Sequence, residues 1–61
     1  MTTFKLEIKC DNAAFADYPG EEIAQILKDL ADKVEDYADF DFEFTLRDSN
    51  GNKVGKAWVE S

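Results

Sequence analysis

Residues 4–10 alternate between apolar and polar side chains. From Phe4 to Cys10 every second residue is apolar, and the residues between them are Lys5, Glu7 and Lys9. A period of two is typical of a strand that buries one face and exposes the other. The pattern therefore predicts a first strand over residues 4–10, whose inner face carries Phe4, Leu6, Ile8 and Cys10.

After a loop, apolar residues recur at intervals of three and four. Pro19 suits the first turn of a helix, and Glu21 and Glu22 follow at the end where the helix dipole favours negative charge. The spacing predicts an amphipathic helix that begins near Pro19 and ends near Tyr37 or Ala38. Its apolar face consists of Ile23, Ile26, Leu27, Leu30, Ala31, Val34 and Tyr37.

A second period of two begins at Phe40 and continues to Arg47, with phenylalanine at the first three inward positions. The segment Asp48-Ser49-Asn50-Gly51 predicts a hairpin turn, because Asn-Gly readily supplies the positive φ that such turns need. Residues 53–60 form the returning strand.

The element order is therefore strand, helix, strand, strand, and 61 residues allow one domain, residues 1–61. We predict an α+β fold in which one amphipathic helix packs on one face of a three-stranded antiparallel sheet. The third strand lies between the other two, because its low charge suits a central position and charged side chains protect edges. A helix of this length spans roughly 30 Å, so it is expected to cover the sheet along its whole length.

The hairpin turn leaves two registers open for the last strand. A two-residue loop, Asn50-Gly51, pairs Leu46 with Gly55 and leaves three side chains on the open face of the sheet, namely Val54, Lys56 and Trp58. A three-residue loop with a bulge shifts the register by one, which buries the valine and the tryptophan but turns the lysine toward the core. We favour the first register because it buries no lysine.

Charge limits the classes of partner. The chain has 14 acidic and 7 basic residues and a net charge of −7. Residues 11–43 hold eleven carboxylates and two lysines, whereas the segments on either side each carry a net charge of +1. Such a field repels nucleic acid and anionic lipid and attracts basic surfaces. We expect no direct nucleic-acid or membrane binding, and a partner with a basic surface.

The residue types do not favour catalysis. The chain lacks histidine, the usual general base and commonest metal ligand. Cys10 has no activating partner and is expected to be an inert core thiol. A calcium-loop pattern from Asp48 onward fails, because Lys53 stands where glycine is required and Val59 where glutamate is required. We predict no enzyme, no catalytic residue, no metal site and no cofactor.

Two surface features are candidate partner-binding sites. Carboxylates line the outer side of the helix and continue into the next strand, and they suit either a solubilising face or docking on a basic patch. This predicted acidic ridge consists of Asp29, Asp32, Glu35, Asp36, Asp39, Asp41 and Glu43. The second feature is the open sheet face, where Trp58 with a charged rim has the composition of an interface core. That face suits partner docking or a homodimer.

Three segments occur in a recognisable order: Cys10-Asp11-Asn12-Ala13-Ala14-Phe15, the helix from Ile23 to Val34, and Leu46-Arg47-Asp48-Ser49-Asn50-Gly51-Asn52-Lys53-Val54-Gly55. Together they resemble a group of very short, mostly uncharacterised proteins encoded by bacteriophages, prophages and other mobile elements of bacteria. The likeness covers nearly the whole chain, except that residues 39–44 depart from the pattern. It implies an inhibitor of a host enzyme or defence complex, the class that includes anti-CRISPR proteins and DNA mimics. It assigns no role to any residue.

These observations predict a non-enzymatic acidic protein-interaction module. It would dock on a basic surface of a host protein, including one that binds nucleic acid, with the carboxylates steering the encounter and Trp58 as an anchor. The lone cysteine and the lack of an apolar leader favour the bacterial host cytoplasm. The alternative is a structural homo-oligomer that assembles through the open sheet face.

Overall fold

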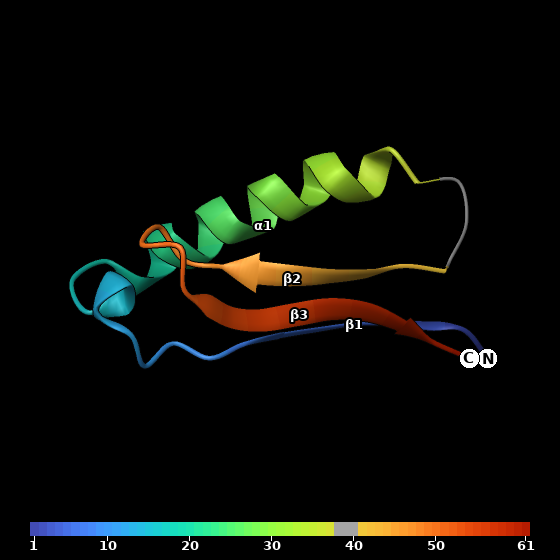
Figure 1. Ribbon diagram of the computed structural model, residues 1–61, viewed down its shortest axis with the longest axis horizontal. Helices are drawn as coiled ribbons and strands as arrows, with labels where there is room; N and C mark the ends of the chain where they lie inside the picture. The colour runs from blue at the N-terminus through green and yellow to red at the C-terminus, as the bar shows by residue number, and fades with distance from the viewer. Residues whose placement is uncertain (38–40) are drawn as a thin grey trace.

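The computed structural model describes residues 1–37 and 41–61. Its elements are β1 (Thr3–Ile8), a 3-10 turn η1 (Ala13–Phe15), α1 (Pro19–Glu35), β2 (Glu43–Arg47) and β3 (Lys53–Glu60). The helix lies across one face of the sheet, and the opposite face is open (Figure 1). The chain therefore forms two layers.

Strand β3 is the centre of the sheet. It pairs antiparallel with β1 on one side and with β2 on the other, in the order β1-β3-β2. The predicted α+β class and the predicted strand order are confirmed. With β3 in the centre, both edge strands are free to carry the charged side chains that discourage unspecific edge pairing.

The end of α1 and the start of β2 lie close to the residues that the structure does not describe. The helix α1 ends at Glu35, and Tyr37 closes one further turn by donating its N–H to the Val34 carbonyl at 3.0 Å. Strand β2 begins at Glu43. The helix end predicted at Ala38 and the strand start predicted at Phe40 lie outside the described residues.

The prediction of a core thiol is wrong, because Cys10 is exposed. Strand β1 ends at Ile8, and pairing with β3 continues for only one more bond, from the Lys9 N–H to the Val54 carbonyl at 2.8 Å. The period of two in the sequence therefore extends two residues beyond the strand. Cys10, the last apolar residue of the alternating pattern, is not covered by another element of the fold.

Residues 48–52 connect β2 to β3, and the pairing of Asp48 with Asn52 encloses a three-residue loop, 49–51. The Gly51 N–H donates to the Asp48 carbonyl at 3.0 Å, and the Asp48 N–H donates to the Asn52 carbonyl at 3.0 Å. Gly51 has a φ of 85°, a conformation that favours glycine. This is the three-residue loop that we associated with the second register, the one that we did not favour.

A bulge next to this loop restores the favoured register. Leu46 pairs with Gly55. Its neighbour Arg47 pairs with Lys53, so Val54 is one extra residue on β3. Val54 is buried, and our prediction that it lies on the open face is wrong, because we assumed that the loop alone sets the register. Beyond the bulge the open face carries the two other side chains that the favoured register placed there, Lys56 and Trp58.

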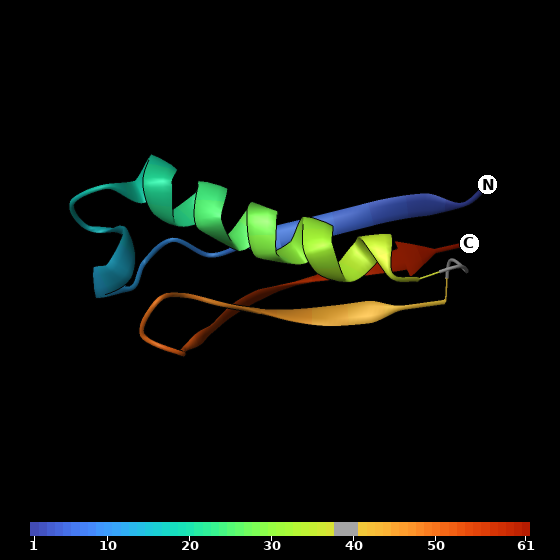
Figure 2. The same ribbon diagram turned by 90° about the horizontal axis from the view of Figure 1, so that it is seen from above.

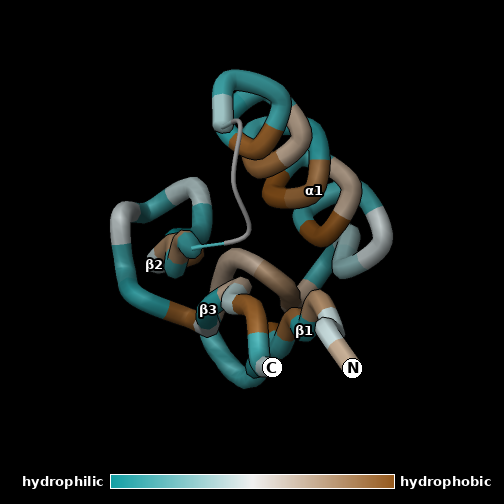
Figure 3. Tube along the Cα trace, turned by 90° about the vertical axis from the view of Figure 1, so that its right-hand side faces the viewer, coloured by the Kyte–Doolittle hydropathy of each residue, from teal (hydrophilic) through white to brown (hydrophobic). Residues whose placement is uncertain are grey.

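The core lies between α1 and the sheet. It contains six buried apolar side chains: Phe15, Ile26, Leu30, Leu46, Val54 and Ala57. The apolar segments of α1, brown in Figure 3, lie mainly on the side of the helix that is nearer to the strands. Ala57 is fully buried at the centre of β3, where its small side chain leaves room for the helix.

The helix crosses the sheet obliquely. Seen from above, its N-terminal end lies on the β1 side and its C-terminal end lies over β3 (Figure 2). The expectation of cover along the length of the sheet therefore does not extend to its full width, and Phe4 and Leu6 on the inner face of β1 remain exposed. Near the end of α1, Tyr37 packs against Phe42 and Phe44, with ring centroids 5.6 and 5.1 Å away.

Replacing Gly55 with alanine tests the close contact between β1 and β3. A Cβ built on Gly55 would overlap the backbone carbonyl of Glu7 in the neighbouring strand, and neither backbone can move cheaply. We expect Gly55→Ala to lower the free energy of unfolding by about 1–3 kcal/mol in urea denaturation.

The matched control is Gly20→Ala, because nothing lies within 4 Å of a Cβ at that helical position. Alanine there is expected to raise the free energy of unfolding by about 0.5–1 kcal/mol. Equal stability of Gly55→Ala and the wild-type protein would contradict the strand contact.

Candidate functional site

Three exposed carboxylates form a continuous line on α1. Asp29, Asp32 and Asp36 are three and four residues apart, a spacing that places them on one side of a helix. We call these three residues the acidic strip. Asp29 also lines a hollow of about 360 Å³ between α1 and β2, together with Arg47 and other side chains. The strip therefore lies on the flank of the helix that faces β2.

Two lysines lie within one helical turn of the acidic strip, since Lys33 follows Asp29 by four residues and Lys28 precedes Asp32 by four. Within the described parts of the chain, one salt bridge is shorter than 4 Å, from Lys5 to Glu60 at 2.9 Å. No carboxylate of the acidic strip forms such a salt bridge there. Among the same residues, one hydrogen bond reaches a strip carboxylate, from the Gln25 side-chain amide to Asp29 at 3.1 Å. The strip thus presents its charge to solvent.

The structure separates the other residues of the predicted ridge from this strip. Glu35 is exposed but lies about 60° further around the helix from Asp32, away from β2. Glu43 pairs with Trp58 on the open face of the sheet, because the next residue, Phe44, turns toward the helix. The ridge is therefore not continuous, since the period of two in a strand sends alternate side chains to opposite faces. Asp41 is exposed just before β2, and Asp39 lies outside the described residues.

Trp58 is half-buried on the open face by charged neighbours. Its indole N–H donates to the Glu60 carboxylate at 3.0 Å, and the Lys56 ammonium lies 4.6 Å from the ring centroid. The hydrogen bond from Trp58, with a second from Lys5, holds the pKa of Glu60 below its ordinary value. These contacts hold the tryptophan against its own sheet.

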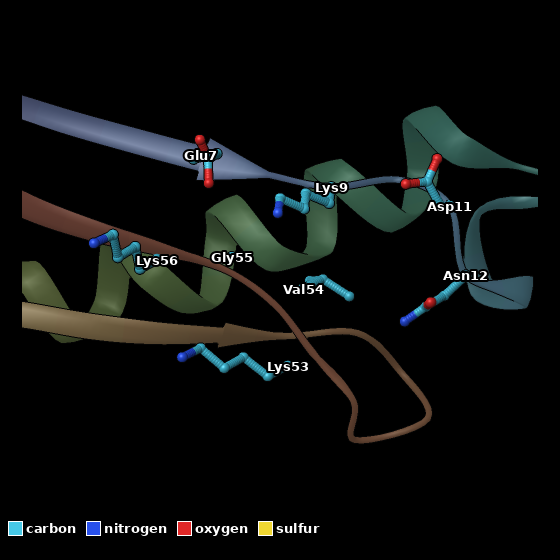
Figure 4. Close-up of a pocket in the computed structure, with 8 residues that line it drawn as sticks. All are labelled: Glu7, Lys9, Asp11, Asn12, Lys53, Val54, Gly55 and Lys56. Carbon is cyan, nitrogen blue, oxygen red and sulfur yellow. The ribbon is translucent and has the colours of Figure 1, made fainter.

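A shallow hollow opens on the sheet beside the bulge, with a volume of about 410 Å³ (Figure 4). Three lysines lie around it, Lys9, Lys53 and Lys56. Glu7 and Asp11 line the same hollow, so its charge is mixed and does not select an anionic ligand. The hollow gives no specific chemistry.

Asp48 joins the hairpin to the loop after β1, a role that we did not predict. One carboxylate oxygen accepts the backbone N–H of Asn50 at 3.0 Å and of Asn52 at 2.9 Å. The other accepts the Asn12 side-chain amide at 3.1 Å. Burial alone would raise the pKa of Asp48, but these hydrogen bonds outweigh it and lower the pKa. The role is structural, and an Asp that opens a turn is the sequence signal for its local part.

Glu22 makes the corresponding connection between the hairpin and the helix. Its two carboxylate oxygens accept the Ser49 backbone N–H at 2.7 Å and the Ser49 hydroxyl at 3.0 Å. Glu22 therefore belongs to the folded framework rather than to the exposed strip. The helix carrying the strip is fixed to the hairpin at its first turn.

Further features bear on chemistry and location. No three His, Cys, Asp or Glu residues are grouped to hold a metal ion within residues 1–37 and 41–61. Over the same residues, no helix combines the length and apolar character needed to cross a membrane. Comparisons with protein families, with curated proteins and with solved structures find no match.

Acid titration tests the Asp48 connection. A lowered pKa means that the folded protein binds the proton more weakly than the unfolded chain, so protonation favours unfolding. The stabilisation from Asp48 is present above its ordinary value of 3.8 and is lost as the pH falls through the lower folded-state pKa. We expect Asp48→Asn to have a lower melting temperature at neutral pH and a weaker loss of stability on acidification.

Asp17→Asn is the control for this titration, because the substitution removes the same charge from an exposed position. Its melting temperature is expected to follow that of the wild-type protein at every pH. An Asp48→Asn variant with the same acid profile as Asp17→Asn would contradict the assigned role.

Proposed function

We propose that the protein is a non-enzymatic interaction module that docks the acidic strip of α1 on a basic surface of a bacterial host protein. The observation that carries the proposal is the line of exposed carboxylates at Asp29, Asp32 and Asp36, none of which forms a salt bridge closer than 4 Å within the described residues. A host protein that binds nucleic acid is the fitting partner class, because its own binding surface is basic.

The spacing of the strip supports this partner class. Asp29 and Asp36 are seven residues apart, which corresponds to about 10 Å along the helix axis. Neighbouring charges are thus about 5 Å apart along the axis, against about 3.4 Å for the phosphates of one DNA strand. The linear charge density of the strip is therefore of the same order as that of one DNA strand. Because α1 is fixed to the hairpin at its first turn, the three carboxylates are held in a defined line.

The strip is expected to act mainly on the rate of association. Exposed carboxylates attract a basic surface over roughly one Debye length, and this attraction weakens as salt is added. Such a module would work in the bacterial cytoplasm as an inhibitor or decoy, in keeping with the resemblance to proteins of phages and mobile elements.

The open sheet face gives the alternative proposal, a structural homo-oligomer. Trp58 lies there with Glu43, on the side of the sheet opposite to α1. A flat partner that contacts the strip does not reach Trp58 at the same time. If the open face is the assembly surface, Trp58→Ala lowers the mass of the particle in solution.

Reversing the charge of the strip tests the leading proposal. The triple variant Asp29→Lys, Asp32→Lys and Asp36→Lys is compared with the wild-type protein as bait in nuclease-treated bacterial lysate, washed first at low and then at high salt. We expect the wild-type protein to retain a basic host protein that high salt releases, and the variant to retain at least tenfold less.

The matched control reverses three carboxylates elsewhere, at Asp11, Asp17 and Glu43, and so has the same net charge as the strip variant. It is expected to retain the partner nearly as well as the wild-type protein. Equal loss in both variants would show that only net charge matters, and equal retention in both would contradict docking through the strip.

A further inference from the structure

Strand β1 has an unpaired edge and a partly uncovered inner face. It pairs with β3 on one side only. Phe4 and Leu6, which point toward the helix layer, are 47% and 37% exposed. Strands at the edge of a sheet offer free N–H and C=O groups to a further strand, and exposed apolar residues beside them favour that addition.

A third apolar side chain lies above the same edge. Leu27 on α1 is 43% exposed and stands two residues from Asp29, which places it on the flank of the helix opposite to the acidic strip. Since Asp29 faces β2, Leu27 faces the β1 side. Toward Thr3 the helix moves away from β1, in the views of both Figure 2 and Figure 3. An apolar flank is therefore left open along β1.

The charges on β1 match a second copy of the same strand. In a two-fold antiparallel pair, residue i contacts residue j and j contacts i. A two-fold axis at Lys5 would set two lysines opposite each other, and an axis at Glu7 would set two glutamates opposite each other. An axis at Leu6 instead sets Lys5 opposite Glu7 of the second copy, twice.

The same register also continues the pattern already present in the sheet. Glu7 pairs with Lys56 of β3 on one side, so a second Lys5 on the other side would give alternating charges across the strands. On the inner face, Leu6 would meet Leu6 of the second copy, and Phe4 would meet Ile8. A shift by one residue would place apolar side chains on the charged face, which excludes the intermediate registers.

We propose that two copies of the chain associate through antiparallel β1 edges, with Leu6 on the two-fold axis, to form one continuous six-stranded sheet. The dimer covers Phe4, Leu6 and Leu27 and leaves the acidic strip of each copy free on the outer flank. This inference goes beyond the proposed function and does not depend on it, because the two surfaces lie on opposite sides of α1.

The first test is the mass of the wild-type protein in solution, measured by sedimentation equilibrium over a range of concentrations. Each copy carries a net charge of −7, so the copies repel at long range and the dimer should strengthen as salt is added. Docking of the strip on a basic partner has the opposite salt dependence, so the two proposals can fail separately. A monomer at high protein concentration in both low and high salt would overturn the dimer.

The second test exchanges charges on β1. Lys5→Glu sets glutamates opposite each other at both symmetric positions, and we expect the dissociation constant of the dimer to rise about tenfold. Adding Glu7→Lys to the same chain restores opposite charges, and the double variant is expected to recover dimerisation. If the double variant remains as weak as Lys5→Glu, the proposed register is wrong.

The third test is a cross-link at the axis. In a Cys10→Ser background, Leu6→Cys places two thiols directly opposite each other, at a separation that suits a disulfide. Mild oxidation is expected to give a covalent dimer. Thr3→Cys in the same background is the control, because its two copies lie at opposite ends of the paired strands and should not cross-link. Equal cross-linking of both variants, or loss of the dimer in Trp58→Ala instead of Lys5→Glu, would overturn the proposal.

Discussion

The surfaces of this molecule depend on one extra residue in the central strand. The three-residue hairpin loop by itself would set β3 in a register that turns Lys56 toward the core. The bulge at Val54 absorbs that shift, because Val54 turns inward while Gly55 pairs with Leu46. This one inserted residue decides on which face of the sheet each following side chain of β3 lies. Ala57 is thereby buried under the helix, and Trp58 lies on the open face.

The two layers of the molecule also differ in charge. Five of the seven basic residues belong to the strands or stand directly beside them: Lys5, Lys9, Arg47, Lys53 and Lys56. The helix carries Lys28 and Lys33 among a larger number of carboxylates. The sheet therefore mixes both signs, whereas the helix is acidic. This difference underlies both proposals, a basic partner for the helix and a second copy of the chain for the sheet edge.

Much of the fold could be predicted from hydrophobic periodicity, and the predictions that failed did so for physical reasons. Alternation and helical spacing located the elements, because those patterns follow directly from burial. The low charge of residues 53–60 indicated β3 as the central strand. Cys10 was misplaced because a period of two can outlast the strand that it describes. Val54 was misplaced because the effects of a loop and a bulge on register cancel, and only the paired strands show both.

The candidate site was less predictable than the fold. Helical spacing alone was enough to find the acidic strip, since residues three and four apart share one side. Glu43 was assigned to the same surface because it is close in sequence, whereas its strand turns it to the opposite face. The roles of Asp48 and Glu22 depend on segments that are far apart in the chain, with bonds to Asn12 and Ser49. Sequence spacing carries no information about such contacts.

Nuclear Overhauser contacts of Val54 and Trp58 in solution test the bulge most directly. With the bulge in place, the Val54 methyl groups are expected to contact core side chains such as Leu30 and Leu46. The indole protons of Trp58 would then contact Lys5 and Lys56 but no residue of α1. Contacts between the Trp58 indole and Ile26 or Leu30 would contradict the bulge and, with it, the assignment of both surfaces.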